Sequence, residues 1–388
     1  MSDKPKLIRI TTVPLSLDKL LEGQLEYMSQ FYDITAISAY DNGYLKIVAE
    51  REKVDYYPIE LTRAITPIKD LKSLFKLIKY FKKVKPTIVH THTPKAGIAG
   101  MLAAKIAGVP IRLHTVAGLP LLEAKGYRRQ LLNIVERFTY ACATAVLPNS
   151  NGLKKIILEE NFTHKDKLHV IGHGSSNGID TAYFDPTLYS DDVNKNLRKS
   201  LGISEDDFVY IFVGRIVRDK GIEELVTAFS NLKDKNIKLL LVGPKEDKLD
   251  PLKRETLNEI IQNPNILDLG WQKDVRPFLS ISNALTFPSY REGFPNVVLQ
   301  AGAMQLPSIV SNINGCNEII KNNWNGIIIP VKDSESLHMA MSEIKNDKEL
   351  YSKLQSHARL EITSHYQRQT IFAALKRFYE LQLEKVNN

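Results

Sequence analysis

Glu292, Arg215 and Lys220 are the residues whose types and surroundings best fit the binding of a phosphorylated, hydroxyl-rich ligand. The apolar run Ala284–Phe287 predicts a buried parallel strand. After a loop we expect a helix whose first residue is Pro295, because proline has no N–H and the first residue of a helix does not need one. A strand, a glycine turn and a helix start direct unpaired backbone N–H groups and the positive end of the helix dipole at an anion. Glu292 stands in that turn, where a carboxylate would accept hydrogen bonds from a neutral group such as a sugar hydroxyl.

Two cations lie in a second loop that suits the same anion. Phe208–Val213 is another apolar run that predicts a buried strand, and Gly214, Arg215 and Lys220 follow it. Arg215 and Lys220 bracket the loop that leads into the next helix. Two such side chains can hold a diphosphate without a metal ion, and the sequence contains no Asp-x-Asp pair that would indicate a metal clamp.

These motifs, Gly214-Arg215 with Lys220-Gly221 and later Glu292-Gly293-Phe294-Pro295, resemble those of the retaining nucleotide-sugar glycosyltransferases of family 4. The resemblance covers nearly the whole chain. It implies the α/β GT-B fold, in which two Rossmann-like doubly wound domains flank a cleft. It also implies transfer of a sugar from a UDP-sugar to an acceptor hydroxyl with retained configuration. Residues 91–100 and 114–120 are most similar to bacterial enzymes that extend polyprenyl-diphosphate-linked glycans, including some that add N-acetylgalactosamine.

The resemblance implies a role for each residue of this site. Glu292 would be catalytic, orienting the sugar and stabilising an oxocarbenium-like centre. The full set of donor-binding residues is Gly214, Arg215, Lys220, Gly293, Phe294, Pro295, Asn296, Val297 and Gln300. The backbone near Gly243, Gly270, Trp271 and Gln272 is expected to contact the base. The family has a second glutamate where this chain has Gln300. Because an amide offers one acceptor and one donor, we expect weaker or differently oriented nucleoside binding without loss of chemistry.

Histidines follow two predicted strands in the first half of the chain. His90 and His92 point the same way because they are two residues apart on a strand, so a metal is conceivable, but no third ligand has suitable spacing and we predict no metal site. The resemblance places an acceptor-binding set here: His90, His92, Thr93, Lys95 and Gly118. It also makes His114, at the next strand end, a second catalytic residue in the same cleft. The alternative is a hydrogen-bonded histidine that only ends a strand. The loop after it, up to Pro120 and Glu123, would shape the acceptor pocket.

Predicted strands and helices alternate through the whole chain in two series, which is typical of two doubly wound sheets. We expect an acceptor-binding domain at residues 1–175, a nucleotide-sugar-binding domain at 176–365, and a last helix at 366–388 that crosses back to the first domain. The first series of strands is predicted at 7–13, 34–38, 87–90, 111–115 and 145–147, with residues 167–172 as a further candidate. A helix is expected at 17–30, with Ser16 as its N-cap and Gly23 inside it.

The composition and net charge limit the classes of binding partner that the sequence suggests. The 388 residues are 43% hydrophobic and carry a formal net charge of +8. No aromatic-studded basic motif or zinc spacing indicates nucleic acid, so a phosphorylated substrate or an anionic membrane surface fits better.

A helix predicted at 70–83 carries five lysines around an apolar stripe; it is either an ordinary surface helix or a face that rests on lipid. No apolar run suits a spanning helix and no signal peptide is visible, so we expect a cytoplasmic protein, peripheral on the inner face of the membrane. Cys142 and Cys316 are expected to be buried thiols.

Two other functions fit the same fold. A nucleotide-sugar 2-epimerase would convert the donor alone, without an acceptor. A non-catalytic nucleotide-sugar-binding partner, suggested by Gln300, would bind UDP without turnover.

Overall fold

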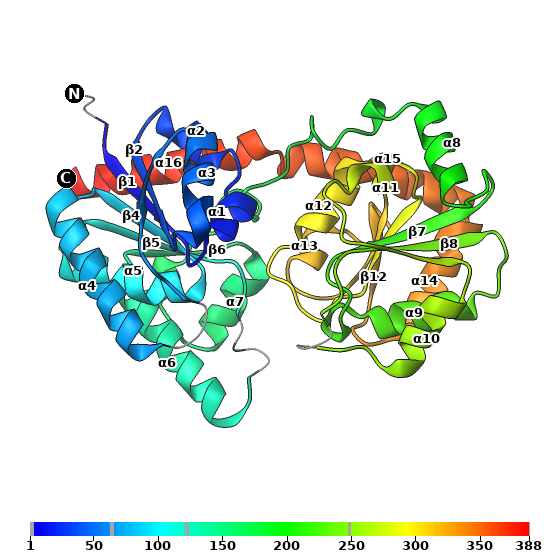
Figure 1. Cartoon of the computed structure of the whole chain (residues 1–388), viewed down its shortest axis with the longest axis horizontal. Helices are drawn as coiled ribbons and strands as arrows, with labels where there is room; N and C mark the ends of the chain where they lie inside the picture. The colour runs from blue at the N-terminus through cyan, green and yellow to red at the C-terminus, as the bar shows by residue number, and fades with distance from the viewer. Residues whose placement is uncertain (1–3, 63–65, 120, 122–123, 247–249, 388) are drawn as a thin grey trace. The chain divides into compact units, whose positions relative to one another are not determined.

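The computed structural model describes residues 4–62, 66–119, 121, 124–246 and 250–387. The chain divides into two compact units (Figure 1). One is Met1–Asn177 together with Gln369–Asn388, and the other is Gly178–Arg368. The last helix therefore belongs to the first unit.

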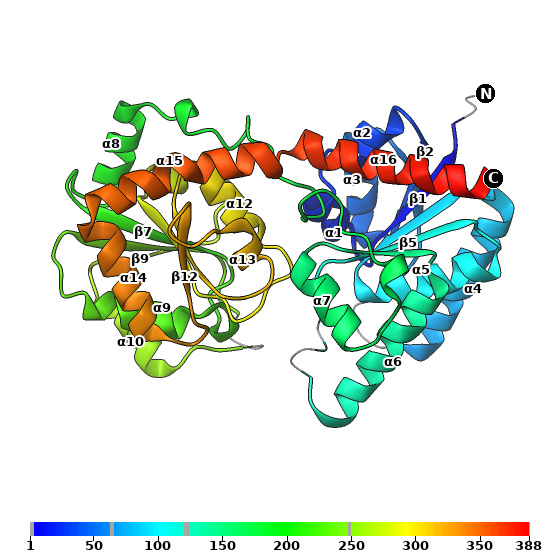
Figure 2. The ribbon, with the colours of Figure 1, turned by 180° about the vertical axis from the view of Figure 1, so that it is seen from behind.

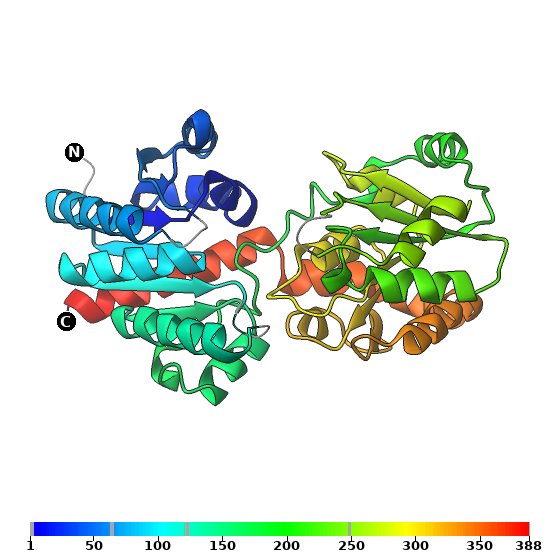
Figure 3. The same ribbon diagram turned by 60° about the horizontal axis from the view of Figure 1, so that its bottom comes forward.

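Six parallel strands form the sheet of the first unit, in the order β3-β2-β1-β4-β5-β6. The strands are β1 (Lys6–Ile10), β2 (Asp33–Ser38), β3 (Asp55–Pro58), β4 (Ile88–His92), β5 (Ile111–Val116) and β6 (Ala145–Pro148). The helices are α1 (Pro14–Leu20), α2 (Gln24–Ser29), α3 (Tyr44–Arg51), α4 (Pro67–Val84), α5 (Pro94–Ile106), α6 (Gly126–Cys142), α7 (Asn151–Glu159) and α16 (Arg368–Asn387). Helices α4, α5 and α6 lie side by side on one face of this sheet, and α16 lies on the other (Figure 3).

Alternation along the strands of the first unit builds a core on each face. Ile8 packs with Leu77 and Phe81 of α4 under the α4–α6 layer. Its neighbour Leu7 packs with Leu375 of α16 and with α1–α3 on the opposite face.

The second unit has the same topology. Its sheet order is β12-β11-β10-β7-β8-β9, again all parallel. The strands are β7 (Phe208–Val213), β8 (Ile237–Val242), β9 (Ile266–Gly270), β10 (Ala284–Phe287), β11 (Ser308–Ser311) and β12 (Gly326–Ile329). The helices are α8 (Asp191–Ser200), α9 (Ile222–Asn231), α10 (Arg254–Gln262), α11 (Arg276–Ser280), α12 (Asn296–Ala303), α13 (Cys316–Ile319), α14 (Ser334–Asn346) and α15 (Lys348–His365).

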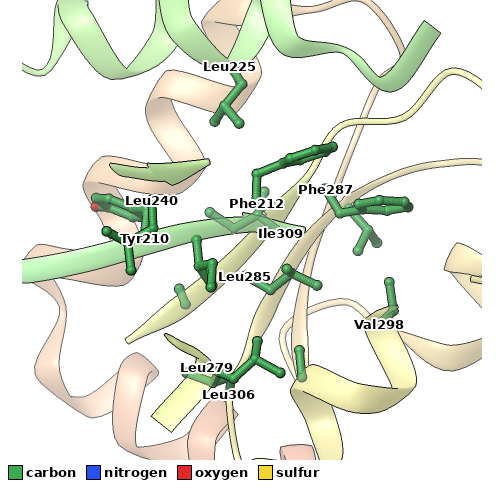
Figure 4. Packing of buried hydrophobic residues seen from close by; sticks show 14 of the residues in the cluster. Tyr210, Phe212, Leu225, Leu240, Leu279, Leu285, Phe287, Val298, Leu306 and Ile309 are labelled. Atoms are coloured by element: carbon green, nitrogen blue, oxygen red, sulfur yellow. The ribbon is translucent and has the colours of Figure 1, made fainter. Parts of the chain in front are cut away.

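One apolar core fills the second unit. Leu225 of α9 and Val298 of α12 reach the sheet from its two sides (Figure 4). Phe212 and Phe287 stack with ring centroids 5.8 Å apart at the ends of β7 and β10. Helix α9 packs on α14 (Figure 2), and α12 packs on α15. The predicted α/β class with two doubly wound sheets is confirmed.

Several local predictions were wrong. The helix expected at 17–30 is two helices, because Gly23 adopts φ +72° and is the N-cap of α2. Ser16 lies inside α1, whose N-cap is Val13. Residues 167–172 form no strand; only Leu168 makes a single bridge to Val146. The exposed edge strand β3, helix α3 and strand β12 were not predicted at all.

The two cysteines and the lengths of the apolar helices test two further predictions. Cys142 and Cys316 are buried and unpaired, as predicted. Within the described ranges, no helix is both long and apolar enough to cross a membrane.

Candidate active site

The loops after β7 and β10 lie against each other at the carboxyl edge of the second sheet. The chain leaves β7 for β8 on one side and later returns to β10 on the other, so this is the point at which ligands bind in open α/β sheets. The Tyr290 N–H donates to the Asp219 carbonyl at 2.9 Å. Gly221 has φ +72°, and a Cβ atom there would lie 2.1 Å from the Pro288 carbonyl oxygen. Glycine is therefore required for the two loops to approach this closely.

The predicted diphosphate cation and the predicted sugar-binding carboxylate form an ion pair between these loops. Lys220 Nζ lies 2.5 Å from Glu292 Oε1, and the two side chains are only 15% and 16% exposed. The buried Ser289 hydroxyl donates to the same carboxylate oxygen at 3.0 Å. Lys220 also lies over the Phe287 ring, 5.9 Å from its centroid. The structure thus brings together two residues that the sequence placed far apart.

Arg215 is held by carboxylates on its own side of the site. Its Nη1 donates to Glu246 Oε2 at 2.8 Å, and its Nη2 lies 3.7 Å from Asp219 Oδ2. Asp219 also pairs with Arg291 at 2.9 Å. An anion that binds here must compete with these acids for the guanidinium.

The turn at residues 293–297 leads into α12 without a side-chain cap among the described residues. Helix α12 begins at Asn296, so the prediction that Pro295 is the first helical residue was wrong. Pro295 has ψ 111°, an extended value, and is the N-cap. Phe294 is buried in the core, while Gln300, one turn into the helix, is half-buried.

Asn314 supports this turn and was missed from the sequence. Its Nδ2 donates to the Glu292 carbonyl and, at 3.3 Å, to the Gly293 carbonyl. It precedes Gly315 just after β11, and an Asn-Gly pair after a strand is a turn signal that could have revealed it.

Three predicted glycines meet at the ends of β7, β8 and β9. The Gly243 N–H donates to the Gly270 carbonyl at 2.8 Å, and a Cβ atom on Gly243 would lie 1.8 Å from the Gly214 carbonyl oxygen. Trp271, the next residue after Gly270, is 68% exposed. The Gln272 amide donates to the Leu269 carbonyl at 2.7 Å. The residues expected to contact a base therefore lie in one place, next to the first residue of the Arg215 loop.

His90 and His92 belong to a buried polar network in the first unit. Their rings are 4.4 Å apart, so they do point the same way. His90 bonds the Tyr379 hydroxyl of α16 at 2.6 Å, and His92 lies 2.7 Å from the guanidinium of the fully buried Arg9. Burial, together with the charge of Arg9, lowers the pKa of both histidines well below the usual value. Both are therefore neutral at neutral pH.

His114 lies on the other face of the sheet. It follows Leu113, which packs on the α16 side, and its Nδ1 bonds the Thr91 hydroxyl at 2.8 Å. Its ring fills the space over Gly97, where a Cβ atom would come within 2.4 Å. Burial lowers the pKa of His114 to about 4. Side chains alternate between the faces of a sheet, so His114 forms no cluster with His90 and His92. Its expected place in the same cleft stays a prediction.

Of the remaining predicted acceptor residues, Thr93 and Lys95 lie at the start of α5, and Gly118 follows β5. Thr93 is the residue before this helix and has φ +73°, an uncommon conformation for a β-branched residue. Its hydroxyl accepts from the Thr12 N–H at 3.2 Å, which ties the ends of β4 and β1 at the switch point of the first sheet. Lys95 pairs with Asp70 at 2.8 Å, and Gly118 is half-buried. Pro120 and Glu123 lie outside the described residues.

Among the described residues, no group of three or more His, Cys, Asp or Glu side chains could hold a metal ion.

Both halves of the chain match models of one enzyme class. A model described as "Glycosyl transferase 4-like domain" matches residues 26–174, and one described as "Glycosyl transferases group 1" matches residues 193–361. The capsular polysaccharide biosynthesis glycosyltransferase CapM of Staphylococcus aureus is 33% identical over 383 residues, which cover 98% of each chain. The chain belongs to the group 1 glycosyltransferases.

A second relative and a solved structure agree with this family assignment. The UDP-Gal:alpha-D-GlcNAc-diphosphoundecaprenol alpha-1,3-galactosyltransferase of Escherichia coli is 35% identical over 295 residues, 75% of this chain and 74% of that one. The crystal structure of HepE from Anabaena in complex with UDP superimposes with a TM-score of 0.81 at 16% identity, covering 97% of this chain and 99% of that one. The GT-B fold and the resemblance to family 4 are confirmed.

Proposed function

We propose that this glycosyltransferase moves a hexose from a UDP-sugar, with retention of configuration, to a sugar linked through a diphosphate to a polyprenol during surface polysaccharide synthesis. The Escherichia coli relative is named for UDP-Gal and a diphosphoundecaprenol-linked GlcNAc, and the Staphylococcus aureus relative for capsular polysaccharide. UDP-galactose is therefore the first donor to test, and a UDP-N-acetylhexosamine is the second. Nucleotide-sugar and lipid-linked acceptor would meet at the cytoplasmic face of the membrane.

The observation that carries this proposal is the meeting of Lys220 and Glu292 at the switch point of the second sheet. Negative charge grows on the leaving diphosphate in the transition state, and fixed cations and N–H groups there stabilise it. Lys220, Arg215 and the N–H groups of residues 293–297 would take this part. Glu292 would orient a sugar hydroxyl and stabilise positive charge at the anomeric carbon.

Retention follows if the acceptor attacks from the side of the leaving group. The anomeric carbon's bond to the diphosphate oxygen breaks, the new bond to the acceptor oxygen forms on the same face, and the diphosphate takes the acceptor's proton. His114, neutral at physiological pH, would contribute a hydrogen bond to the sugar rather than a positive charge.

We further propose that the diphosphate is held without a metal ion. Arg215 and Lys220 supply two cations, and the start of α12 supplies backbone donors that no described side chain caps. Activity should then persist in excess EDTA.

The test is a titration with UDP followed by a transfer assay with labelled UDP-galactose and synthetic undecaprenyl-diphospho-GlcNAc. We expect micromolar-range UDP binding, label in the lipid fraction, and an α-configured product by NMR. Arg215→Ala should weaken UDP binding by about tenfold or more, since hydrogen bonds between charged groups contribute roughly 1.5–3 kcal/mol each. The matched control is Arg254→Ala, an exposed arginine at the start of α10.

Three outcomes contradict the proposal. Unchanged UDP affinity in Arg215→Ala excludes the diphosphate role of that residue. Epimerised UDP-sugar from the donor alone identifies a 2-epimerase. UDP binding without turnover, across both donors and several lipid-linked acceptors, identifies a non-catalytic binding partner.

A further inference from the structure

Helix α6 carries large apolar side chains on its outer face. Glu136, Thr139 and Tyr140 are buried, so that side of the helix faces the sheet. The opposite side presents Tyr127, Leu131, Ile134 and Phe138, which are 81%, 37%, 63% and 44% exposed. These residues are spaced three and four apart and therefore share one face. A surface helix normally turns its whole apolar stripe inward. Here the inner side holds the core residues Tyr140 and Cys142 beside the buried Glu136 and Thr139, while four large apolar side chains remain outside.

Helix α4 shows a similar outward row. Leu77 and Phe81 pack in the core. Ile68, Leu71 and Phe75 do not, and they are 74%, 53% and 62% exposed. Part of the apolar stripe expected on this helix therefore lies on the surface, because Leu71 and Phe75 do not pack on the sheet.

The two rows belong to one layer of the first unit. Helix α5 lies between α4 and α6 (Figure 3) and offers the half-buried Ala99 and Leu102. We call this surface the α4–α6 face; its exposed apolar members are Ile68, Leu71, Phe75, Tyr127, Leu131, Ile134 and Phe138. All three helices return antiparallel to the strands, so they begin at the carboxyl edge of the sheet, where Thr93 precedes α5. One end of the face therefore adjoins the predicted acceptor residues.

The charges around the α4–α6 face have one sign. Every exposed charged side chain that the structure describes on α4 and α6 is a cation: Lys69, Lys72, Lys76, Lys79, Lys82, Lys83, Arg128 and Arg137. Of the two acids on these helices, Asp70 pairs with Lys95 and Glu136 is buried. None of the six lysines of α4 forms an ion pair with a described acidic side chain. A basic, apolar helix face with this distribution suits the interface of an anionic bilayer.

We propose that the α4–α6 face docks on an anionic phospholipid bilayer, with its apolar side chains below the headgroups and its lysines among them. The interaction needs neither donor nor acceptor, so it can be tested separately from the glycosyl transfer proposed above.

The experiment is flotation of the full chain with vesicles of phosphatidylcholine alone or mixed with phosphatidylglycerol. We expect binding only to the anionic vesicles, and weaker binding as salt is raised. The double variant Phe75→Ser/Ile134→Ser should lower the partition coefficient by about tenfold or more, because each side chain loses apolar burial in the membrane. The double variant Lys72→Gln/Lys76→Gln should lower it by about fivefold per lysine.

Matched controls lie in the second unit. Ile261→Ser removes a side chain that is 77% exposed on α10, and Lys348→Gln/Lys353→Gln removes two exposed lysines of α15. Both controls should bind vesicles as the unchanged chain does. All variants must keep UDP affinity and circular dichroism, which is expected because the altered side chains are exposed.

The proposal is overturned if the chain binds neither vesicle, if it binds both equally, or if face and control variants lose binding alike. A concentration-dependent dimer that the Phe75 and Ile134 changes abolish, without vesicle binding, would assign the face to a second copy of the chain and also overturn it.

Discussion

Lys220 Nζ lies 2.5 Å from Glu292 Oε1, and this ion pair joins the loop that follows β7 to the loop that follows β10. Each partner is expected to bind a different part of the donor: Lys220 the diphosphate and Glu292 the sugar. In the structure they neutralise each other, so donor binding must replace this contact with two new ones.

Changes at the two partners should therefore have different effects. Lys220→Ala should weaken UDP binding by roughly tenfold to a hundredfold, because a charge-assisted hydrogen bond to phosphate is lost. Glu292→Gln should leave UDP affinity unchanged or raise it, since Lys220 is released, while kcat falls by about a hundredfold or more. Calorimetric UDP titration and the transfer assay measure the two separately. A fall in UDP affinity in Glu292→Gln would show that the ion pair organises the phosphate site instead of competing with it.

Gly221→Ala should destabilise the second unit and disturb the proposed donor site. The new Cβ atom would lie 2.1 Å from the Pro288 carbonyl oxygen at a φ of +72°. We expect the free energy of unfolding to fall by about 2 kcal/mol or more, measured by urea denaturation. Gly118→Ala is the matched control because, among the described residues other than its two chain neighbours, no atom lies within 4 Å of the Cβ position there. Equal stability of the two variants would show that the loops can separate at little cost.

Gln300→Glu should tighten nucleoside binding or leave it unchanged. The side chain is half-buried on α12, one turn from the helix start, and a carboxylate offers two acceptors for ribose hydroxyls. UDP and UMP titrations, with uridine as a phosphate-free comparison, measure the effect. A collapse of transfer activity in this variant would mean that the amide makes a contact that a carboxylate cannot replace.

His114→Gln should reduce the acid sensitivity of the fold. Burial lowers the pKa of His114 to about 4 from the ordinary 6.5, so below pH 6.5 the unfolded chain binds a proton that folded His114 does not. The free energy of unfolding should therefore fall as the pH drops from 6.5 towards 4, by about 1.4 kcal/mol per pH unit for this group, and show no such contribution above 6.5. Denaturation curves at several pH values measure the slope. In the glutamine variant, the pH dependence of the free energy of unfolding should be smaller by the contribution of one proton. The contributions of His90 and His92 should remain, because burial lowers their pKa values as well. Parallel curves for both proteins would contradict the buried, neutral state of His114.

The sequence by itself determined the fold class and the loops that follow β7 and β10, because these depend on local signals. Apolar runs predict the buried strands β7 and β10, and the glycines and charges that follow each run mark the carboxyl edge of the sheet. The edge strand β3 gave no such signal, because its four residues are all exposed and need no apolar pattern. Strand β12 does carry a local signal, the apolar run of residues 327–329, although it was not predicted.

Only the tertiary structure decided the partners and directions of side chains. Strand register and alternation put His114 against Gly97 on one face of the first sheet and His90 with Arg9 and Tyr379 on the other. The pairing of Lys220 with Glu292 depends on β7 and β10 being neighbours, which is a property of sheet order and not of either motif. The outward rows of α4 and α6 depend likewise on which helix face the sheet covers. Sequence periodicity shows that residues share a face, but only packing shows whether that face meets the core or the surroundings.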